Sequence, residues 1–126
     1  MPAGDAFSSA QQAEIDRAIR GAETTSRFEF SVYVGPSDGE SRPFAQRLHA
    51  SLSSPDRSVL ILVDPAARLL EIVTGHDVRR TLGNDVVGLA AVEMQTCFAA
   101  GDLLGGIVNG LAQLAESART PITLHG

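Results

Sequence analysis

The sequence contains no lysine, no tryptophan and a single cysteine, Cys97, among its 126 residues. The absence of lysine excludes a phosphate-loop lysine, Schiff-base chemistry and any catalytic lysine. A single cysteine excludes an intramolecular disulfide, and with it a scaffold built on disulfides. All ten basic residues are arginine and the net charge is −5. This charge argues against a general nucleic-acid binder, because contacts to phosphates need a basic surface.

Long apolar runs are also missing. The two longest, near residues 86–92 and 103–115, are shorter than the roughly 18–20 residues that a membrane span requires, and polar residues interrupt them. Asp5 stands near the start, where a secretory signal would carry basic residues. We therefore expect a soluble, cytoplasmic protein without a membrane-spanning segment.

The composition is that of an ordinary globular domain, with 44% hydrophobic and 20% charged residues. A chain of this length can bury enough surface to form a core without disulfides or structural metals. We expect one domain over residues 1–126, with its core over about 7–118 and short tails at both ends.

Hydrophobic spacing predicts the secondary structure. Apolar residues at helical spacing, with a serine and a glutamine placed to cap the start, indicate a helix from about Ser8 to Glu23. Three further helices are expected over about 43–52, 84–100 and 103–118. Strands are expected where apolar residues alternate or run unbroken, over 28–34, 58–63 and 69–74, with a short edge strand over 121–124.

The connections define the fold class. A helix joins the first two strands, so these should lie parallel with a right-handed crossover. The five residues 64–68 are too few for a parallel crossover, so the second and third strands should form an antiparallel hairpin. The run over 58–63 has no polar side, and helices must therefore cover both sheet faces. We expect a small three-layer α/β/α sandwich, with a mixed sheet of three to four strands flanked by about four helices.

Three stretches of the chain resemble motifs of the TPM domain family, which joins thylakoid-lumen, photosystem-repair and receptor-modulator proteins. Residues 56–60 resemble its Asp-Asn-Gly-Val-Leu entry to the central strand, and Arg68 to Ile72 with Gly75 resembles its basic strand ending at glycine. The third stretch resembles its Gly-Asp-Tyr-x-x-Gly-Ile-x-x-Gly helix junction and comprises Phe98, Gly101, Asp102, Gly106, Ile107 and Gly110. The resemblance spans residues 7–118.

The chain departs from that family over residues 75–80, where the sequence Gly-His-Asp-Val-Arg-Arg replaces Gly-x-Gly-Leu-Glu-Gly. The family's glutamate position is then close to Arg79, and the chain resembles a divergent, soluble branch from a high-GC bacterium. The resemblance implies one of two functions for this chain. Some family members are linked to divalent-metal binding and weak acid phosphatase activity, and others are accessory factors for membrane complexes.

Four residues near the outer end of the hairpin are candidates for metal chemistry: Asp56, His76, Asp77 and Asp85. The outer ends of a hairpin lie side by side, so Asp56 should approach residues 75–77. Carboxylates on adjacent loops suit Ca²⁺ or Mg²⁺, whereas Zn²⁺ would prefer more histidine or thiolate ligands. The sequence predicts a metal site at Asp56, Asp77 and Asp85. In the alternative interpretation, Asp56 and Asp77 are loop residues that cap nearby amides.

Arg79 and Arg80 follow this acidic segment. A guanidinium group binds phosphate or carboxylate with two parallel hydrogen bonds, so one of them could hold an anionic ligand. In a metal-dependent phosphatase, Arg79 would hold the ester while Asp77 or His76 served as acid or base. The alternative is that both arginines are exposed and pair with Asp77 or Glu71.

The remaining polar groups have structural interpretations. We expect His49 to face solvent, His125 to lie in a frayed terminus and Cys97 to be a small buried hydrophobe. Glycines 101, 105, 106 and 110 should allow close helix packing on the sheet or on a second copy of the chain. Because no complete catalytic constellation is present, we expect a non-catalytic accessory module that binds a protein partner, with or without a structural divalent ion. The alternative is a weak, metal-dependent acid phosphatase.

Overall fold

The central strand of the sheet is β2, Ser58–Asp64, and every one of its residues is buried. The computed structural model describes residues 7–119, and within them β2 pairs with β1, Glu29–Val34, in parallel and with β3, Leu69–Thr74, in antiparallel orientation. Val32 lies opposite Ile61 in one pair and Ile61 lies opposite Ile72 in the other. The predicted mixed sheet with its hairpin is therefore confirmed.

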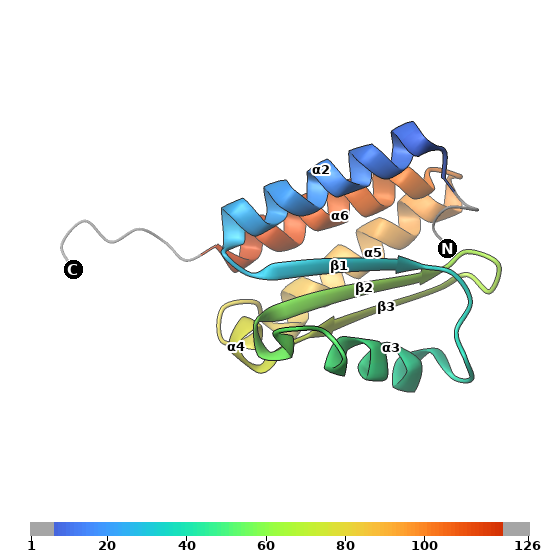
Figure 1. Ribbon diagram of the computed structural model, residues 1–126. Helices are drawn as coiled ribbons and strands as arrows, with labels where there is room; N and C mark the ends of the chain where they lie inside the picture. The colour runs from blue at the N-terminus through green and yellow to red at the C-terminus, as the bar shows by residue number, and fades with distance from the viewer. Residues whose placement is uncertain (1–6, 120–126) are drawn as a thin grey trace.

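Five α-helices and one short 3-10 helix, η1 at Pro55–Arg57, surround this sheet in the described part of the chain. Figure 1 shows three long helices on one face and a single helix on the other, which confirms the predicted α/β/α sandwich. The helices on the first face are α2, Ser9–Ser26; α5, Asn84–Ala99; and α6, Leu103–Ala118. Opposite them lies α3, Ser41–Ala50, and the short α4, His76–Arg79, follows β3.

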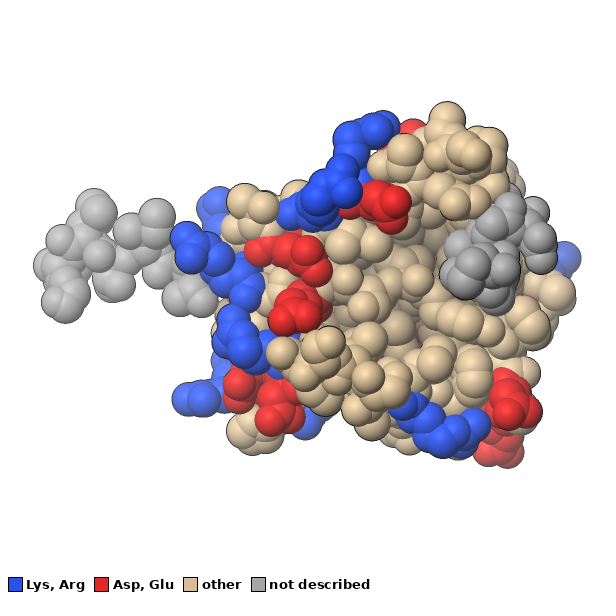
Figure 2. All heavy atoms as spheres, viewed as in Figure 1, with Lys and Arg blue, Asp and Glu red and all other residues tan. Residues whose placement is uncertain are grey.

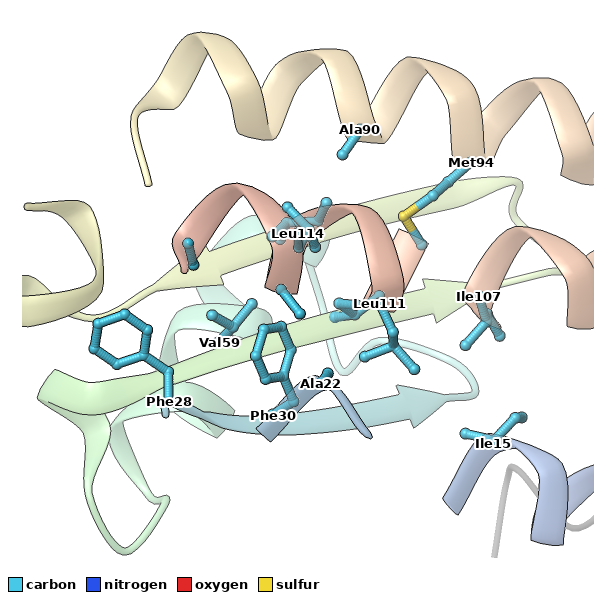
Figure 3. Packing of buried hydrophobic residues seen from close by; sticks show 14 of the residues in the cluster. Ile15, Ala22, Phe28, Phe30, Val59, Ala90, Met94, Ile107, Leu111 and Leu114 are labelled. Carbon is cyan, nitrogen blue, oxygen red and sulfur yellow. The ribbon is translucent and has the colours of Figure 1, made fainter. Parts of the chain in front are cut away.

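The alternation of side chains along β2 divides the core into two clusters. Val59, Ile61 and Val63 pack against the three-helix layer, where α6 contributes Ile107, Leu111 and Leu114 (Figure 3). Leu60 and Leu62 point to the other face and pack with Ala45, Val73 and partly buried side chains of α3. Successive side chains of a strand point to opposite faces, which is why an unbroken apolar strand needs both helical layers.

Local sequence fixes several helix ends. The hydroxyl of Ser8 accepts from the amide of Gln11, whose side chain accepts in turn from the amide of Ser8, forming the predicted capping box at α2. Asp102 caps α6, because its carboxylate accepts from the amide of Gly105 at 2.8 Å. Gly101 adopts a left-handed conformation with φ +87° after the end of α5, as glycine does at many helix ends.

Three predicted features differ from the structure. The helix expected to end at about Glu23 continues to Ser26, and the helix expected over 43–52 spans Ser41–Ala50. The segment after Gly75, expected to be a loop, forms α4 because Val78 anchors it in the core with no exposed surface. The strand expected over 121–124 and His125 lie outside the described residues.

Arginine side chains cover the outer edge of β3. The amide of Gly75 donates to the carbonyl of Ser58, so the backbone groups of Gly75 point toward β2. Backbone groups of an antiparallel strand alternate in direction from one residue to the next, and the carbonyls of Ile72 and Thr74 therefore point away from β2. Arg42 donates to the carbonyl of Ile72 at 2.9 Å, and Arg79 donates to the carbonyl of Thr74. In the view of Figure 2, charged side chains gather toward the end where β1 begins, and the middle of this face is uncharged.

Candidate functional site

The sequence-predicted acidic site lies where β2 begins and β3 ends. We call this the closed end of the hairpin and define it as residues 55–58 with residues 75–79. Gly75 packs directly against η1: a Cβ atom at this position would lie 2.1 Å from the carbonyl oxygen of Pro55 and 2.5 Å from that of Asp56. The predicted approach of Asp56 to the segment after β3 is therefore present, and it is a backbone contact that requires glycine.

The side chains at the closed end are not gathered around one point. The imidazole Nδ1 of His76 lies 3.3 Å from Oδ1 of Asp77, and both groups are accessible to solvent. The Asp85 carboxylate lies close to Gly83, the N-cap of its own helix. A Cβ atom built at Gly83 would be 2.8 Å from the Oδ1 atom of Asp85. A negative charge is favourable at a helix N-terminus, which accounts for this orientation.

The structure therefore does not bring Asp56, Asp77 and Asp85 into one group. Within residues 7–119, no three side chains of histidine, cysteine, aspartate or glutamate form a cluster that could hold a metal ion. The physical reason is that Asp85 belongs to α5 and follows the geometry of that helix, whereas Asp77 belongs to α4.

Neither Arg79 nor Arg80 pairs with a carboxylate among the described residues, so the predicted pairing of these arginines with Asp77 or Glu71 is wrong. Arg79 donates to the carbonyl of Thr74, and Arg80 is exposed and forms no ion pair with a described residue. Glu71 instead accepts from Ser41 at 2.6 Å and pairs with Arg42 at 3.4 Å. Its side chain points to the α3 face of the sheet, because neighbouring strand residues alternate between faces.

Two further predictions about single residues need correction. His49 is buried and not solvent-facing, and its Nε2 lies 2.9 Å from the carbonyl oxygen of Ser58. The turn after α3 brings this ring against the start of β2. Cys97 is half-buried, not fully buried, and it lies on the side of α5 that contacts Gly106.

At the opposite end of the hairpin, a cavity of about 400 Å³ opens beside the β2–β3 turn. We call this the open end and define it as residues 63–70 with residues 95–103. Figure 1 shows that the β2–β3 turn and α4 lie at opposite ends of the sheet. The cavity walls are mostly apolar, and two charged residues, Asp64 and Arg68, contribute to them.

The side of α5 that points away from the core carries exposed apolar residues. We define the outer face of α5 by its exposed positions at helical spacing, which are Asp85, Gly88, Leu89, Val92, Thr96 and Ala99. Leu89 and Val92 are 56% and 58% exposed, one turn apart. At its C-terminal end this face reaches the cavity, because Ala99 also lines the cavity wall.

Neither the cavity nor the outer face of α5 was predicted from the sequence. The signal for the outer face was available, because residues 84–99 have apolar residues all around the helix, and such a helix in a small domain leaves one apolar side uncovered. The signal for the cavity was weaker: a carboxylate, Asp64, at the end of an otherwise apolar central strand.

The fold and these surfaces define a small α/β domain with a three-stranded mixed sheet. The chain belongs to a family described as a domain of unknown function (DUF5130), which matches residues 2–115. Within residues 7–119, no helix combines the length and the apolar character needed to cross a lipid bilayer.

Among curated proteins, the chain is similar to an uncharacterised protein of Mycobacterium tuberculosis, from strains CDC 1551 / Oshkosh and ATCC 25618 / H37Rv. The identity is 23% over 109 residues, which cover 86% of this chain and 65% of the relative. The chain thus spans slightly less than two thirds of the length of these relatives.

Solved structures share the fold. The BA42 protein of the psychrophilic bacterium Bizionia argentinensis matches with a TM-score of 0.80 and 20% identity, covering 89% of this chain and 81% of that one. The N-terminal domain of the cg2496 protein of Corynebacterium glutamicum matches with a TM-score of 0.70 and 18% identity, covering 89% and 71% of the two chains. At these identities, the matches establish the fold alone.

Proposed function

We propose that this chain is a non-catalytic interaction module that binds a partner protein through the outer face of α5. The observation that carries the proposal is the exposure of Leu89 and Val92, at 56% and 58%, on adjacent turns of one helix. Fully burying a leucine or valine side chain is worth roughly 1.5–3 kcal/mol, so two such anchors can supply a large share of a moderate affinity.

The charges on α5 indicate the chemistry of the partner. The helix carries two acidic residues, Asp85 and Glu93, and no arginine. Both acidic residues are exposed beside the apolar anchors. A partner segment with apolar residues flanked by basic ones would complement this surface. A second copy of the chain fits less well, because two acidic α5 faces would oppose each other.

The resemblance to the TPM domain family agrees with this proposal, since part of that family consists of accessory factors for membrane complexes. It also implies the second candidate, a metal-dependent phosphatase around Asp56, His76, Asp77, Arg79 and Asp85. We favour the interaction module because these side chains do not converge on one point, whereas the apolar anchors on α5 lie side by side.

Photo-crosslinking tests the proposal. With p-benzoylphenylalanine at the position of Val92 in cells that make the protein, we expect one discrete crosslinked product whose partner peptide carries apolar and basic residues. The same group at Ala13, exposed on α2, should not give this product. The Leu89→Ser substitution should weaken it.

Two other results would contradict the proposal. A crosslink from position 92 to the chain itself would assign the face to self-association. Divalent-ion-dependent hydrolysis of p-nitrophenyl phosphate that is lost in an Asp56→Asn, Asp77→Asn double variant would favour the phosphatase.

A further inference from the structure

The cavity at the open end has the properties of a small-molecule site. Its volume of about 400 Å³ falls within the roughly 300–1,000 Å³ that is usual for ligand pockets. Apolar walls come from two separate parts of the fold: Val63 and Leu70 from the hairpin, and Phe98 and Leu103 from the α5–α6 junction. Such pockets bind the apolar part of a ligand, while a few polar groups fix its orientation.

Asp64 supplies one of these polar groups. The residue is only 7% exposed, although it carries a carboxylate. One oxygen, Oδ1, accepts a hydrogen bond from the amide of Ala67 at 3.3 Å, and no arginine or histidine of residues 7–119 forms an ion pair with it. A carboxylate can accept several hydrogen bonds, and a ligand in the cavity that Asp64 lines could supply donors for the positions that the fold leaves open. The fold itself supplies only one long hydrogen bond.

Arg68 supplies the second polar group. It lines the same cavity and is four residues from Asp64, yet the two side chains form no ion pair. Its backbone has a left-handed conformation, φ +57°, which is part of the turn geometry at this end of the hairpin. The lining of the cavity therefore includes a buried acidic residue and an exposed basic residue that are not in ion-pair contact with each other.

We propose that the cavity binds a small zwitterion with an apolar side chain, that is, an apolar α-amino acid. The ammonium group would contact the Asp64 carboxylate, the ligand carboxylate would contact the Arg68 guanidinium, and the side chain would pack between Phe98 and Leu103. A simple cation would be repelled by Arg68 and a simple anion by Asp64. A ligand with both charges can contact both groups favourably.

This inference does not depend on docking at the outer face of α5. The two surfaces meet at Ala99, but their anchors differ: Leu89 and Val92 for the partner, Asp64 and Arg68 for the ligand. A Leu89→Ser variant should therefore bind the amino acid as the unmodified chain does.

A titration with matched ligands tests the inference. Addition of L-leucine to the ¹⁵N-labelled chain should shift amide resonances of residues 63–70 and 95–103 in a saturable manner. Isopentylamine, which lacks the carboxylate, and 4-methylpentanoate, which lacks the ammonium group, should bind at least about 10-fold more weakly, since each leaves one charged contact unmade. Glycine should bind weakly because it has no side chain for the apolar walls.

Variants of the chain complete the test. Asp64→Asn keeps an acceptor for the amide of Ala67, so it should fold normally and lose at least about 10-fold in affinity for L-leucine. Arg68→Asn removes the positive charge with a residue that tolerates the left-handed conformation, and it should have a similar effect. Asp38→Asn, in the exposed loop before α3, is the control and should change nothing.

Three results would overturn the inference: no saturable shifts with L-leucine or L-phenylalanine, unchanged binding by the Asp64→Asn variant, or isopentylamine binding as tightly as leucine.

Discussion

At one end of the β2–β3 hairpin, Gly75 lies against the backbone of Pro55 and Asp56, whereas at the other end the turn borders a cavity of about 400 Å³. Both ends carry aspartate and arginine. At the closed end Arg79 donates to a backbone carbonyl, and His49 contacts the carbonyl of Ser58 nearby. At the open end Asp64 and Arg68 line the same cavity and form no ion pair with each other.

A cluster of polar residues in the sequence therefore does not by itself locate a binding site. The closed end has more ionisable residues, but its backbone is packed too tightly to admit a ligand beside Gly75. The open end has fewer, and there the helices α5 and α6 leave room. Substitutions at the closed end should therefore destabilise the fold strongly, and those at the open end should change its stability less.

The largest expected effect is that of Gly75→Ala. A Cβ atom 2.1 Å from a backbone oxygen forces the hairpin and η1 apart, and we expect a loss of about 3 kcal/mol in the free energy of unfolding. Urea denaturation followed by circular dichroism measures it. The control is Gly88→Ala, at an exposed helical position with nothing within 4 Å of the new atom, which should gain about 0.5–1 kcal/mol. Equal effects of the two substitutions would refute the close contact at Gly75.

The next effect concerns His49. Its replacement by alanine leaves a cavity beneath α3 and removes one of the two hydrogen bonds to the carbonyl of Ser58, which keeps the bond from the amide of Gly75. We expect a loss of about 2 kcal/mol in the free energy of unfolding. Gln46→Ala, at an exposed position of the same helix, should have little effect in the same denaturation experiment. A His49 variant as stable as the Gln46 variant would show that the ring contributes no structural contact.

A smaller effect is expected for Asp102, at the open end. Asp102→Ala removes the acceptor for the amide of Gly105 and should cost about 1 kcal/mol, the usual contribution of an N-cap. Asp102→Asn keeps an acceptor and should remain within a few tenths of a kcal/mol of the unmodified chain. If both variants lost the same stability, the charge and not the hydrogen bond would be the stabilising factor. Thermal unfolding distinguishes these results.

The smallest expected change is that of Asp64→Asn in the ligand-free protein. Since the buried carboxylate has no ion-pair partner among residues 7–119, its neutralisation should leave stability unchanged or raise it by up to about 1 kcal/mol. The midpoint of thermal unfolding, compared with that of Asp38→Asn, measures the change. If the free energy of unfolding fell by more than about 1 kcal/mol, the Asp64 carboxylate would be a structural group, as the residues at the closed end are. The two ends of the hairpin would then not differ in the way described.

The sequence predicted those features that depend on local spacing. Alternation over residues 28–34 and the apolar run over 58–63 defined the strands, and the short link over 64–68 required a hairpin. The approach of Asp56 to Gly75 followed from the hairpin alone. These inferences succeed because strand pairing and side-chain alternation follow from the backbone.

Features that depend on packing between distant segments could not be predicted in this way. The burial of His49 depends on how α3 sits on the sheet, and the direction of Asp85 depends on the start of α5. The cavity exists because the α5–α6 junction stands away from the β2–β3 turn, and nothing in the order of residues gives that separation. The metal ligands predicted from the sequence, Asp56, Asp77 and Asp85, were chosen without knowledge of this packing, and they do not form one group in the structure.

The arginines at the outer edge of β3 have a consequence for aggregation. An uncovered strand edge can recruit a further strand from another molecule, which is a common route to fibrous assembly. Arg42 and Arg79 occupy two of the carbonyls to which such a strand would bind. A guanidinium group keeps its proton throughout the pH range in which proteins fold, so this protection does not depend on pH. A chain whose basic residues are all arginine thus keeps its third strand shielded even in strongly alkaline surroundings, near about pH 10, where lysine would lose its charge.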